Sequence, residues 1–288
     1  MLLTIFTPTY NRADFLEKLY NSLKPQNNLE FEWLIVDDGS SDNTEEVIYT
    51  FSKENIININ YIKQKNFGKH IAINTGVQNA KGNYFFIVDS DDYLVENAIE
   101  KIFENLPKIN NREDICGLIF NRINNEGKTI GGENEYNLLE TSLYHLKFKY
   151  RLISDKAEIF KTEILRKYPF PYFENEKFSP EALIMYKMSG KYKILYINEG
   201  IYVGEYLDGG LTSNITKIRM NSPKATTLYY KEHFERAENI IEKLKCAINY
   251  YRFRYNDSFN IEDLPFPYLA FKIAGYLMYK RDLKILSK

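Results

Sequence analysis

The stretch Asn83-Tyr-Phe-Phe-Ile-Val-Asp-Ser-Asp-Asp92 joins a short apolar run directly to three carboxylates. The apolar residues Tyr84 to Val88 predict a buried strand. Three acids beside the end of that strand would repel one another and raise their own pKa values unless a positive charge lies among them. A divalent cation is the usual solution, and oxygen ligands suit Mg2+ or Mn2+. We therefore expect a metal-dependent ligand site at the carboxyl end of this strand, where open α/β sheets bind their ligands.

The sequence on both sides of this stretch alternates between strand and helix patterns. Apolar runs predict strands at 3–7, 33–36, 57–62, 84–88 and 115–120, with helical spacing of apolar residues between them. Asn11 is the expected N-cap of the first helix, and Asp42 is the expected cap of the second. Strands that alternate with helices predict an α/β fold with a mostly parallel sheet and helices on both faces.

After residue 121 the pattern changes. Asn124-Asn-Glu-Gly127 predicts the turn of a hairpin, and a helix is expected at 180–189. Two further strands are expected at 193–197 and 201–206. From about residue 215 the chain reads as helices rich in Tyr, Lys and Arg. We therefore expect one domain over 1–214 and a small C-terminal helical region at 215–288.

The composition argues against several classes of protein. A net charge of −1 provides no general field for nucleic acid, so no nucleic-acid partner is expected. No uninterrupted apolar run is long enough to span a bilayer, and the first residues lack the features of a signal peptide. Cys116 and Cys246 lie far apart and form no ligand motif, which fits a reducing cytoplasm best.

Polar clusters follow three of the predicted strands, at 7–12, 37–42 and 89–92. In a parallel sheet these clusters emerge at the same edge, so they can converge on one ligand. The chain has no G-x-G-x-x-G after the first strand, and the surroundings of Gly68-Lys69 do not match a P-loop.

Four motifs in this order resemble the GT-A glycosyltransferases of family 2. They are Thr-Pro-Thr-Tyr-Asn-Arg at 7–12, Val-Asp-Asp-Gly-Ser-Ser-Asp at 36–42, Asn66-x-Gly68 with Ala72-x-Asn74-x-Gly76, and Asp89-Ser-Asp-Asp92. Each motif is weak alone, whereas four in the same order are specific. The resemblance implies a Rossmann-like GT-A domain with a nucleotide-binding half at 1–121 and an acceptor half at 122–214.

The resemblance also implies roles for single residues. Pro8 and Tyr10 would line the nucleobase pocket, with Tyr10 against the ring. Asp38 would accept a hydrogen bond from a uracil or guanine N–H, and Lys69 would approach the diphosphate. The remaining donor-binding candidates lie in the same motifs: Arg12, Gly68, Asn74, Asp89 and Ser90.

The acidic cluster carries the implied metal site. Asp91 would coordinate the Mn2+ or Mg2+ ion that bridges the diphosphate oxygens. Asp89 would face the ribose or sugar and contribute to the same site, while Asp92 would support the loop. A simpler alternative is that these acids cap the following helix, but capping needs one acid rather than three.

Inverting transfer to a hydroxyl needs one general base and no covalent protein nucleophile. Family members place this base as an acid before a helix in the second half of the domain, and the matching segment here implies Glu181. It follows Pro180 at a predicted helix start, where the helix dipole favours an ionised carboxylate. Ala182 replaces the second acid of the family pattern, so Glu174 and Glu176 remain alternatives.

Other segments have competing interpretations. Glu205 to Thr212 resembles a loop that lies near the donor phosphates or the acceptor in a subset of these enzymes. His70 is expected to be structural, and Trp33 is expected in the core. The run Tyr250 to Tyr255 either packs inside a helical appendage or contacts a membrane surface or a lipid-diphosphate acceptor.

The sequence thus predicts an inverting, metal-dependent transferase that moves a sugar from a nucleoside diphosphate sugar, with a UDP-sugar favoured, to a hydroxyl of a saccharide or lipid-linked saccharide. The resemblance implies surface polysaccharide assembly in bacteria, in the cytoplasm or peripherally at the inner face of the membrane. One alternative is a sugar nucleotidyltransferase, which normally carries a Gly-rich loop after its first strand. The other is a catalytically silent module that binds sugar nucleotides.

Overall fold

The computed structural model describes residues 2–28, 30–204, 214–255 and 261–286. The chain divides into two compact units, and each is built from two stretches of sequence. The first unit comprises residues 1–169 and 191–206, and the second comprises 170–190 and 207–288. The predicted boundary after residue 214 stays a prediction, and the second unit groups residues 170–190 with the C-terminal helices.

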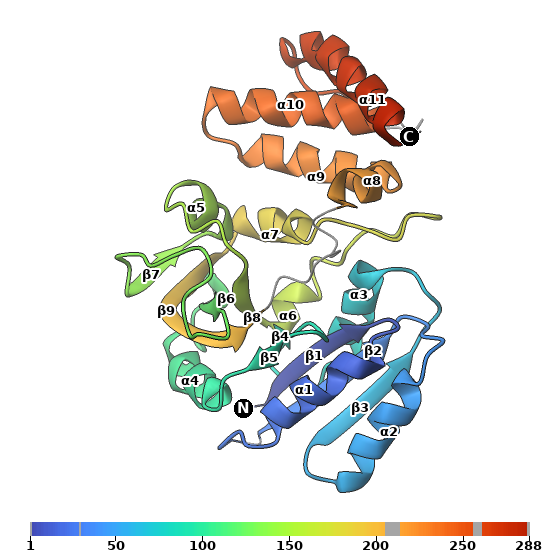
Figure 1. The fold of residues 1–288 in the computed structure, drawn as a ribbon. Coiled ribbons are helices and arrows are strands. Elements are labelled where there is room, and N and C mark those ends of the chain that lie inside the picture. Colours follow the sequence, from blue (N-terminus) through green and yellow to red (C-terminus); the bar gives the residue numbers. More distant parts are fainter. Residues whose placement is uncertain (1, 29, 205–213, 256–260, 287–288) are drawn as a thin grey trace. The chain divides into compact units, whose positions relative to one another are not determined.

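The first unit begins with four parallel strands, as expected (Figure 1). Their order in the sheet is β3-β2-β1-β4. Each successive pair of strands is joined by a helix, which is the connection that parallel strands require. The elements are β1 (Leu3–Thr9), α1 (Ala13–Leu23), β2 (Phe31–Asp37), α2 (Thr44–Glu54), β3 (Asn58–Lys63), α3 (Lys69–Asn79) and β4 (Tyr84–Ile87).

The rest of the sheet is mixed. β8 (Lys156–Lys161) runs antiparallel between β4 and β6 (Ile115–Ile123), and β9 (Lys193–Val203) runs parallel to β6. β5 (Tyr93–Leu94) and β7 (Leu138–Thr141) pair with β9 in the antiparallel sense. The expected mostly parallel arrangement is confirmed, because β6 and β9 run in the same direction as β1 to β4, and only β8, β5 and β7 run against it. Short helices α4 (Ala98–Asn105), η1 (Leu106–Lys108), α5 (Leu143–Phe148) and α6 (Thr162–Leu165) complete the unit.

β9 corrects one expectation. The two strands expected around Asn198 to Gly200 are one continuous strand, because the turn-like residues lie in an irregular stretch of the pairing with β6. Ile119 pairs with Tyr196 and Asn121 pairs with Gly200, so β9 contains the extra residues of a bulge. The predicted hairpin turn is confirmed: the Gly127 N–H donates to the Asn124 carbonyl at 2.9 Å.

Helices cover both faces of the sheet, as predicted. On one face, Leu16 of α1 and Phe51 of α2 belong to one buried cluster with Trp33. Trp33 is fully buried, as expected, and its Nε1–H donates to Thr7 Oγ1 at 2.9 Å. On the other face, α3 lies so close to β1 that a Cβ added at Gly76 would meet the ring of Phe6 at 2.2 Å. This contact fixes the position of α3 along β1. The N-terminus of α3 follows the loop at 64–68.

The second unit is helical. Its elements are α7 (Ala182–Ser189), α8 (Ile215–Met220), α9 (Pro223–Arg236), α10 (Ile240–Arg254), η3 (Tyr268–Phe271) and α11 (Lys272–Leu286). Tyr250, Tyr251 and Phe253 are buried, so most aromatic rings of the run at 250–255 pack inward. Within the described ranges, each helix is too short or too polar to cross a bilayer.

Candidate functional site

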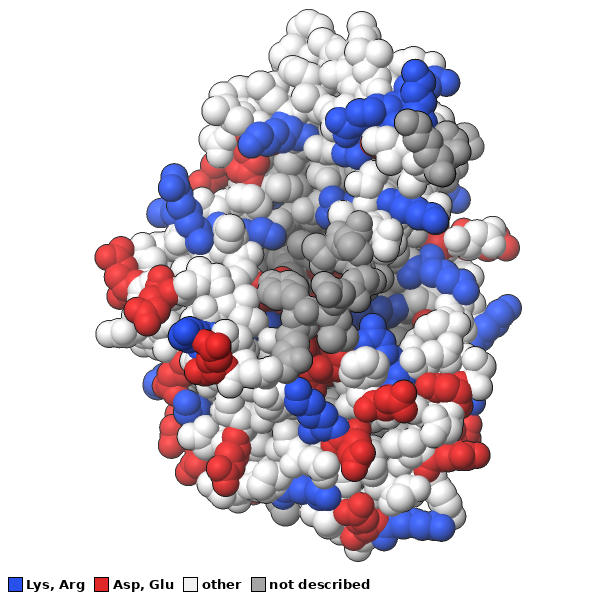
Figure 2. All heavy atoms as spheres, in the orientation of Figure 1, with Lys and Arg blue, Asp and Glu red and all other residues white. Residues whose placement is uncertain are grey.

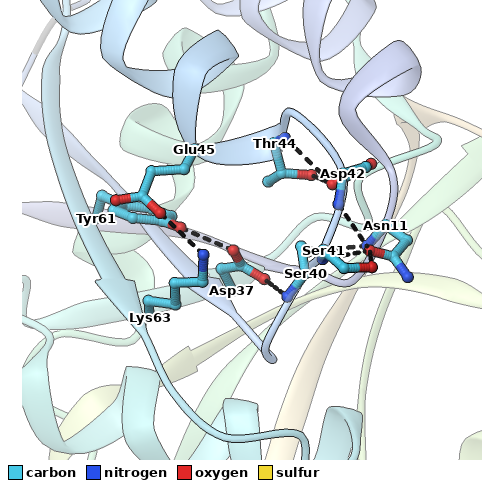
Figure 3. A network of polar contacts seen from close by, with 9 residues as sticks. All are labelled: Asn11, Asp37, Ser40, Ser41, Asp42, Thr44, Glu45, Tyr61 and Lys63. Carbon is cyan, nitrogen blue, oxygen red and sulfur yellow. Dashed lines mark hydrogen bonds and ion pairs between the residues drawn. The ribbon is translucent and has the colours of Figure 1, made fainter.

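Two loops at the carboxyl ends of β1 and β2 are bound to each other (Figure 3). Asn11 has a φ of 51°, and this left-handed conformation directs its N–H to Ser40 Oγ at 2.8 Å. Its side-chain Oδ1 accepts from the Ser41 N–H at 2.8 Å. In the other direction, Asp42 Oδ2 accepts from the Ala13 N–H of α1 at 3.2 Å.

Of the two expected caps, Asp42 reaches across to α1, whereas Asn11 binds the loop before α2. The N-cap positions belong to Arg12 for α1 and Asn43 for α2, and neither makes a side-chain capping bond. Asp42 accepts from the first N–H of α1 and also from the Thr44 N–H of α2 at 3.1 Å, which confirms its capping role in part. The hydrogen bonds between the two loops hold the loop that carries Tyr10 and Arg12 in a fixed position relative to the end of β2.

Asp38 supports the loop that precedes α3. Its Oδ1 accepts from the Phe67 N–H at 3.0 Å and from Gln64 Nε2 at 2.7 Å, and its Oδ2 accepts from the Gly68 N–H at 2.7 Å. Gly68 has a φ of 95°, a conformation that residues with a side chain rarely adopt. Asp38 thus directs the chain from β3 toward Lys69, a structural role that the sequence motif did not indicate.

The acids after β4 are paired with cations from distant parts of the first unit. Lys69 Nζ lies 2.6 Å from Asp89 Oδ1, and Arg12 Nη1 lies 2.7 Å from Asp91 Oδ2. Burial alone would raise the pKa of Asp89, but the charges of Lys69 and Arg122 hold that pKa below its usual value. The residues predicted from separate motifs are therefore brought together at one edge of the sheet.

Arg122 and Tyr202 brace the acidic loop, and the sequence analysis missed both. The Tyr202 O–H donates to Asp92 Oδ2 at 2.6 Å and accepts from the Asp89 N–H at 3.0 Å. The Arg122 guanidinium lies over the Tyr202 ring at 4.0 Å and 3.3 Å from Asp92 Oδ2. Burial raises the pKa of Asp92 to about 6, although both neighbours favour its ionised form. A charged residue ending an apolar strand was the available signal for Arg122.

The other predicted donor-binding residues surround this cluster. Tyr10, directly after β1, is 48% exposed, so its ring is accessible to a stacking partner. Pro8 is buried within β1, where it pairs with Val36, and Ser90 is buried within the acidic loop. Asn74 is half-buried in the middle of α3.

The carboxylates of the acidic loop are oxygen ligands of the kind that Mg2+ and Mn2+ prefer. The side chains of Asp89 and Asp91 are 22% and 27% exposed, so solvent reaches both carboxylates. Among the described residues, no group of three or more His, Cys, Asp or Glu side chains is arranged to hold a metal ion. Mg2+ is commonly bound by one or two carboxylates together with substrate phosphates, and the pair Asp89 and Asp91 fits that pattern.

The three candidate bases have different surroundings in the second unit. Glu176 is buried, and its two carboxylate oxygens accept from the Lys224 and Ala225 N–H groups at 2.7 and 2.9 Å. Its carboxylate therefore caps the N-terminus of α9. Glu181 is half-buried directly before α7 and makes no capping bond to that helix, while Glu174 is exposed. The segment from Glu205 to Thr212 lies outside the described residues.

His70 yields a testable pH dependence. It is 3% exposed, and burial lowers its pKa to about 4 from the usual 6.5. Between these values the unfolded chain binds a proton that the folded chain excludes, so stability should fall with acidification by up to about 1.4 kcal/mol per pH unit. Because the raised pKa of Asp92 acts in the opposite direction between about pH 6 and 4, the slope of His70 is measured as the difference between wild type and His70→Gln in urea unfolding from pH 7 to 4. An equal slope in the variant would show that His70 does not cause this pH dependence.

Comparison with known proteins agrees with this geometry. Residues 4–170, more than half of the chain, match the model of the family described as glycosyl transferase family 2. The chain belongs to this family. The match spans the loops that carry Tyr10, Asp38, Lys69 and Asp91. The family model ends at the start of the second unit.

Two relatives of known sequence are both named as glycosyltransferases. Glycosyltransferase GlyA of Streptococcus pneumoniae is 28% identical over 228 residues, which is 73% of this chain and 31% of GlyA. The family 2 chain thus spans about a third of that relative. TuaG of Bacillus subtilis, a glycosyltransferase named for teichuronic acid biosynthesis, is 33% identical over 104 residues, which is 36% of this chain and 41% of TuaG.

Two solved structures resemble most of the chain. S. aureus TarS 1–349 matches with a TM-score of 0.65 and 19% identity, covering 90% of this chain and 73% of that one. The mannosyltransferase PcManGT from Pyrobaculum calidifontis, solved with GDP-Man and Mn2+, matches with a TM-score of 0.59 and 14% identity, covering 97% and 87%. At these identities the likeness shows the fold, which is the expected GT-A fold with C-terminal helices.

Proposed function

We propose that this family 2 chain is an inverting, metal-dependent transferase that moves a sugar from a nucleoside diphosphate sugar, with UDP-sugars favoured, to a hydroxyl of a saccharide or lipid-linked saccharide. One observation carries the proposal: an exposed aromatic ring, three cations and three acids gather at the carboxyl edge of the parallel strands. A nucleoside diphosphate needs these three kinds of group, for its base, its phosphates and its metal. The TarS structures solved with UDP and with UDP-GlcNAc support a uridine donor.

Each part of the donor has a candidate partner in the first unit. The Tyr10 ring would stack on the base, and Asp38 would accept from a base N–H with the lone pair that its three loop contacts leave. Lys69 begins α3, where the helix N-terminus adds positive potential next to its ammonium group. These placements favour a diphosphate between α3 and the acidic loop.

Asp91, together with Asp89, would hold the Mg2+ or Mn2+ ion, which stabilises the charge on the departing diphosphate. Arg12 and Lys69 pair with these carboxylates. With an ion held by Asp89 and Asp91, Arg12 and Lys69 would be available to the phosphate oxygens. The site then keeps its charges balanced before and after binding, so donor and metal should bind cooperatively.

This exchange predicts opposite effects for Arg12→Gln. Mn2+ alone should bind about two- to fivefold more tightly, the scale of a partly exposed ion pair, because the competing cation is gone. UDP in the presence of Mn2+ should bind more weakly, because a phosphate ligand is lost. Electron paramagnetic resonance of free Mn2+ measures the first effect and calorimetry the second. Arg12→Lys, which keeps the charge, is the control, and unchanged affinity for Mn2+ alone would contradict the exchange.

A thermal-shift panel tests the donor class. Nucleoside diphosphates and their sugars are each added with and without Mn2+, and the largest stabilisation is expected for a UDP-sugar with the ion present. Equal stabilisation by all bases would contradict base recognition by Tyr10 and Asp38. Release of free sugar from the preferred donor then separates an enzyme from a silent binding module. Release of pyrophosphate from a nucleoside triphosphate and a sugar phosphate would instead indicate a nucleotidyltransferase.

We propose Glu181 as the general base that accepts the proton of the acceptor hydroxyl. It is half-buried directly before α7, where the backbone of the helix start fixes its position. Glu176 is a poorer candidate, since a proton acceptor needs a carboxylate oxygen that reaches its substrate and both of its oxygens bind α9. In the proposed single displacement the activated hydroxyl attacks the anomeric carbon from the face opposite the departing diphosphate, so the configuration at that carbon would invert.

The proposed setting is surface polysaccharide assembly in the cytoplasm. The relative TuaG is named for teichuronic acid biosynthesis, which supports a role in polysaccharide assembly. The described chain contains two buried cysteines that form no disulfide, Cys116 and Cys246. Burial raises the pKa of each thiol to about 12, which suppresses the reactive thiolate. Such thiols fit a reducing compartment.

A further inference from the structure

Two contacts set the orientation of α11 in the second unit and so determine which of its faces points outward. A Cβ added at Gly275 would lie 2.6 Å from Tyr251 Cβ and 2.8 Å from the Arg252 N of α10, so the two helices approach closely there. About two turns further on, Asp282 is 1% exposed and accepts from Arg252 Nε at 2.5 Å. Gly275 and Asp282 therefore define the inner side of α11.

The opposite side of α11 is apolar over its first turns. Ile273 is 72% exposed and Leu277, one turn later, is 63% exposed. Large apolar side chains are also concentrated along this part of the chain: eight of the eighteen that are exposed in the described chain lie within residues 266–286. They are Phe266, Leu269, Ile273, Tyr276, Leu277, Leu283, Ile285 and Leu286. Such concentration on a soluble surface marks an interaction site rather than chance exposure.

The charges on the same side are all positive. Lys280, Arg281 and Lys284 are exposed, whereas the one acid of α11 is the buried Asp282. At 100° per residue, Lys280 and Lys284 lie on the same side as Ile273 and Leu277. Figure 2 agrees, since the described residues over α11 at the upper end of that view are white and blue. We call the exposed residues of 266–286 the α11 face.

We propose that the α11 face is a peripheral membrane-binding surface that takes anionic lipid headgroups. Apolar and aromatic side chains would enter the interface, and the cations beside them would contact lipid phosphates. A second copy of the chain fits less well, because an isologous contact through this face would bring its cations together. The proposal is independent of the donor site, since none of its residues belongs to that site.

Vesicle sedimentation with the full chain tests the proposal. Vesicles of phosphatidylcholine alone are compared with vesicles that also contain phosphatidylglycerol, and binding is expected with the anionic lipid. Lys280→Glu should weaken that binding by about fivefold or more, since each cation near an anionic surface contributes about that factor. Ile273→Ser should weaken it as well, because the inserted side chain is lost.

Matched variants on the first unit are the controls. Ile153→Ser removes an isoleucine that is 68% exposed, and Lys128→Glu reverses a lysine whose side chain is 77% exposed. Both should bind vesicles like the wild type. Equal loss in control and α11 variants, or binding that ignores lipid charge, would overturn the proposal. So would a mass that grows with concentration in solution and falls in Ile273→Ser, because the face would then join two copies.

Discussion

Replacing Glu181 by glutamine is expected to leave donor binding nearly unchanged while lowering the rate of sugar transfer by about 10²–10⁴-fold. Glutamine keeps the size and shape of the side chain but does not accept the proton of the acceptor hydroxyl. The measurement is the transfer rate at saturating donor, together with the dissociation constant of the donor. A loss of binding as large as the loss of rate would mean that Glu181 holds the donor rather than the proton.

The neighbouring acids are the controls for this result. Glu174→Gln should change little, because this side chain is exposed. Glu176→Gln should lower thermal stability, since glutamine has only one oxygen for the two N–H groups that Glu176 accepts from. The other N–H group would face the side-chain NH2 and lose its acceptor. If either variant lost the transfer rate while Glu181→Gln kept it, the base would be assigned to the wrong acid. Retention of the donor's anomeric configuration would refute single displacement altogether.

Asp91→Asn is expected to remove the metal-dependent part of donor binding and to lower transfer by about 10³-fold, the scale of a lost metal contribution of several kcal/mol. Calorimetry of UDP with and without Mn2+ gives the metal-dependent part directly. Asp114→Asn is a matched control, because Asp114 also pairs with an arginine, Arg112, at 2.7 Å, but on the exposed surface. Undiminished metal-dependent affinity in Asp91→Asn would exclude this residue as a ligand.

The elements around the donor site could be predicted because their signals are local. The apolar run before Asp89 and the helical spacing after residue 69 each lie within a short window of sequence. β9 was divided in error for the same reason, since Asn198 to Gly200 looks like a turn unless the pairing with β6 is known. Propensity and spacing describe a segment, whereas a bulge belongs to two strands.

The interactions of the site were less predictable than its residues. Arg12 and Asp91 are separated by 79 positions, and Asp92 and Tyr202 by 110, so no local pattern connects them. The sequence analysis therefore expected a metal ion among the acids but not the arginine and lysine that neutralise them. The bonds that Asn11 and Asp42 make across the two loops escaped prediction likewise, because each residue type is also a good cap for its own helix.

The bond between Glu176 and α9 has a consequence for dividing the chain. A fragment that ends at residue 204 would retain each described strand and the loops around Lys69 and Asp91. Its stretch at 170–190 would lose the backbone groups of α9 and the stacking of Tyr186 on Tyr229 at 5.7 Å. Shortening the chain there should therefore separate nucleotide capture from sugar delivery, leaving a receptor that recognises the donor without consuming it.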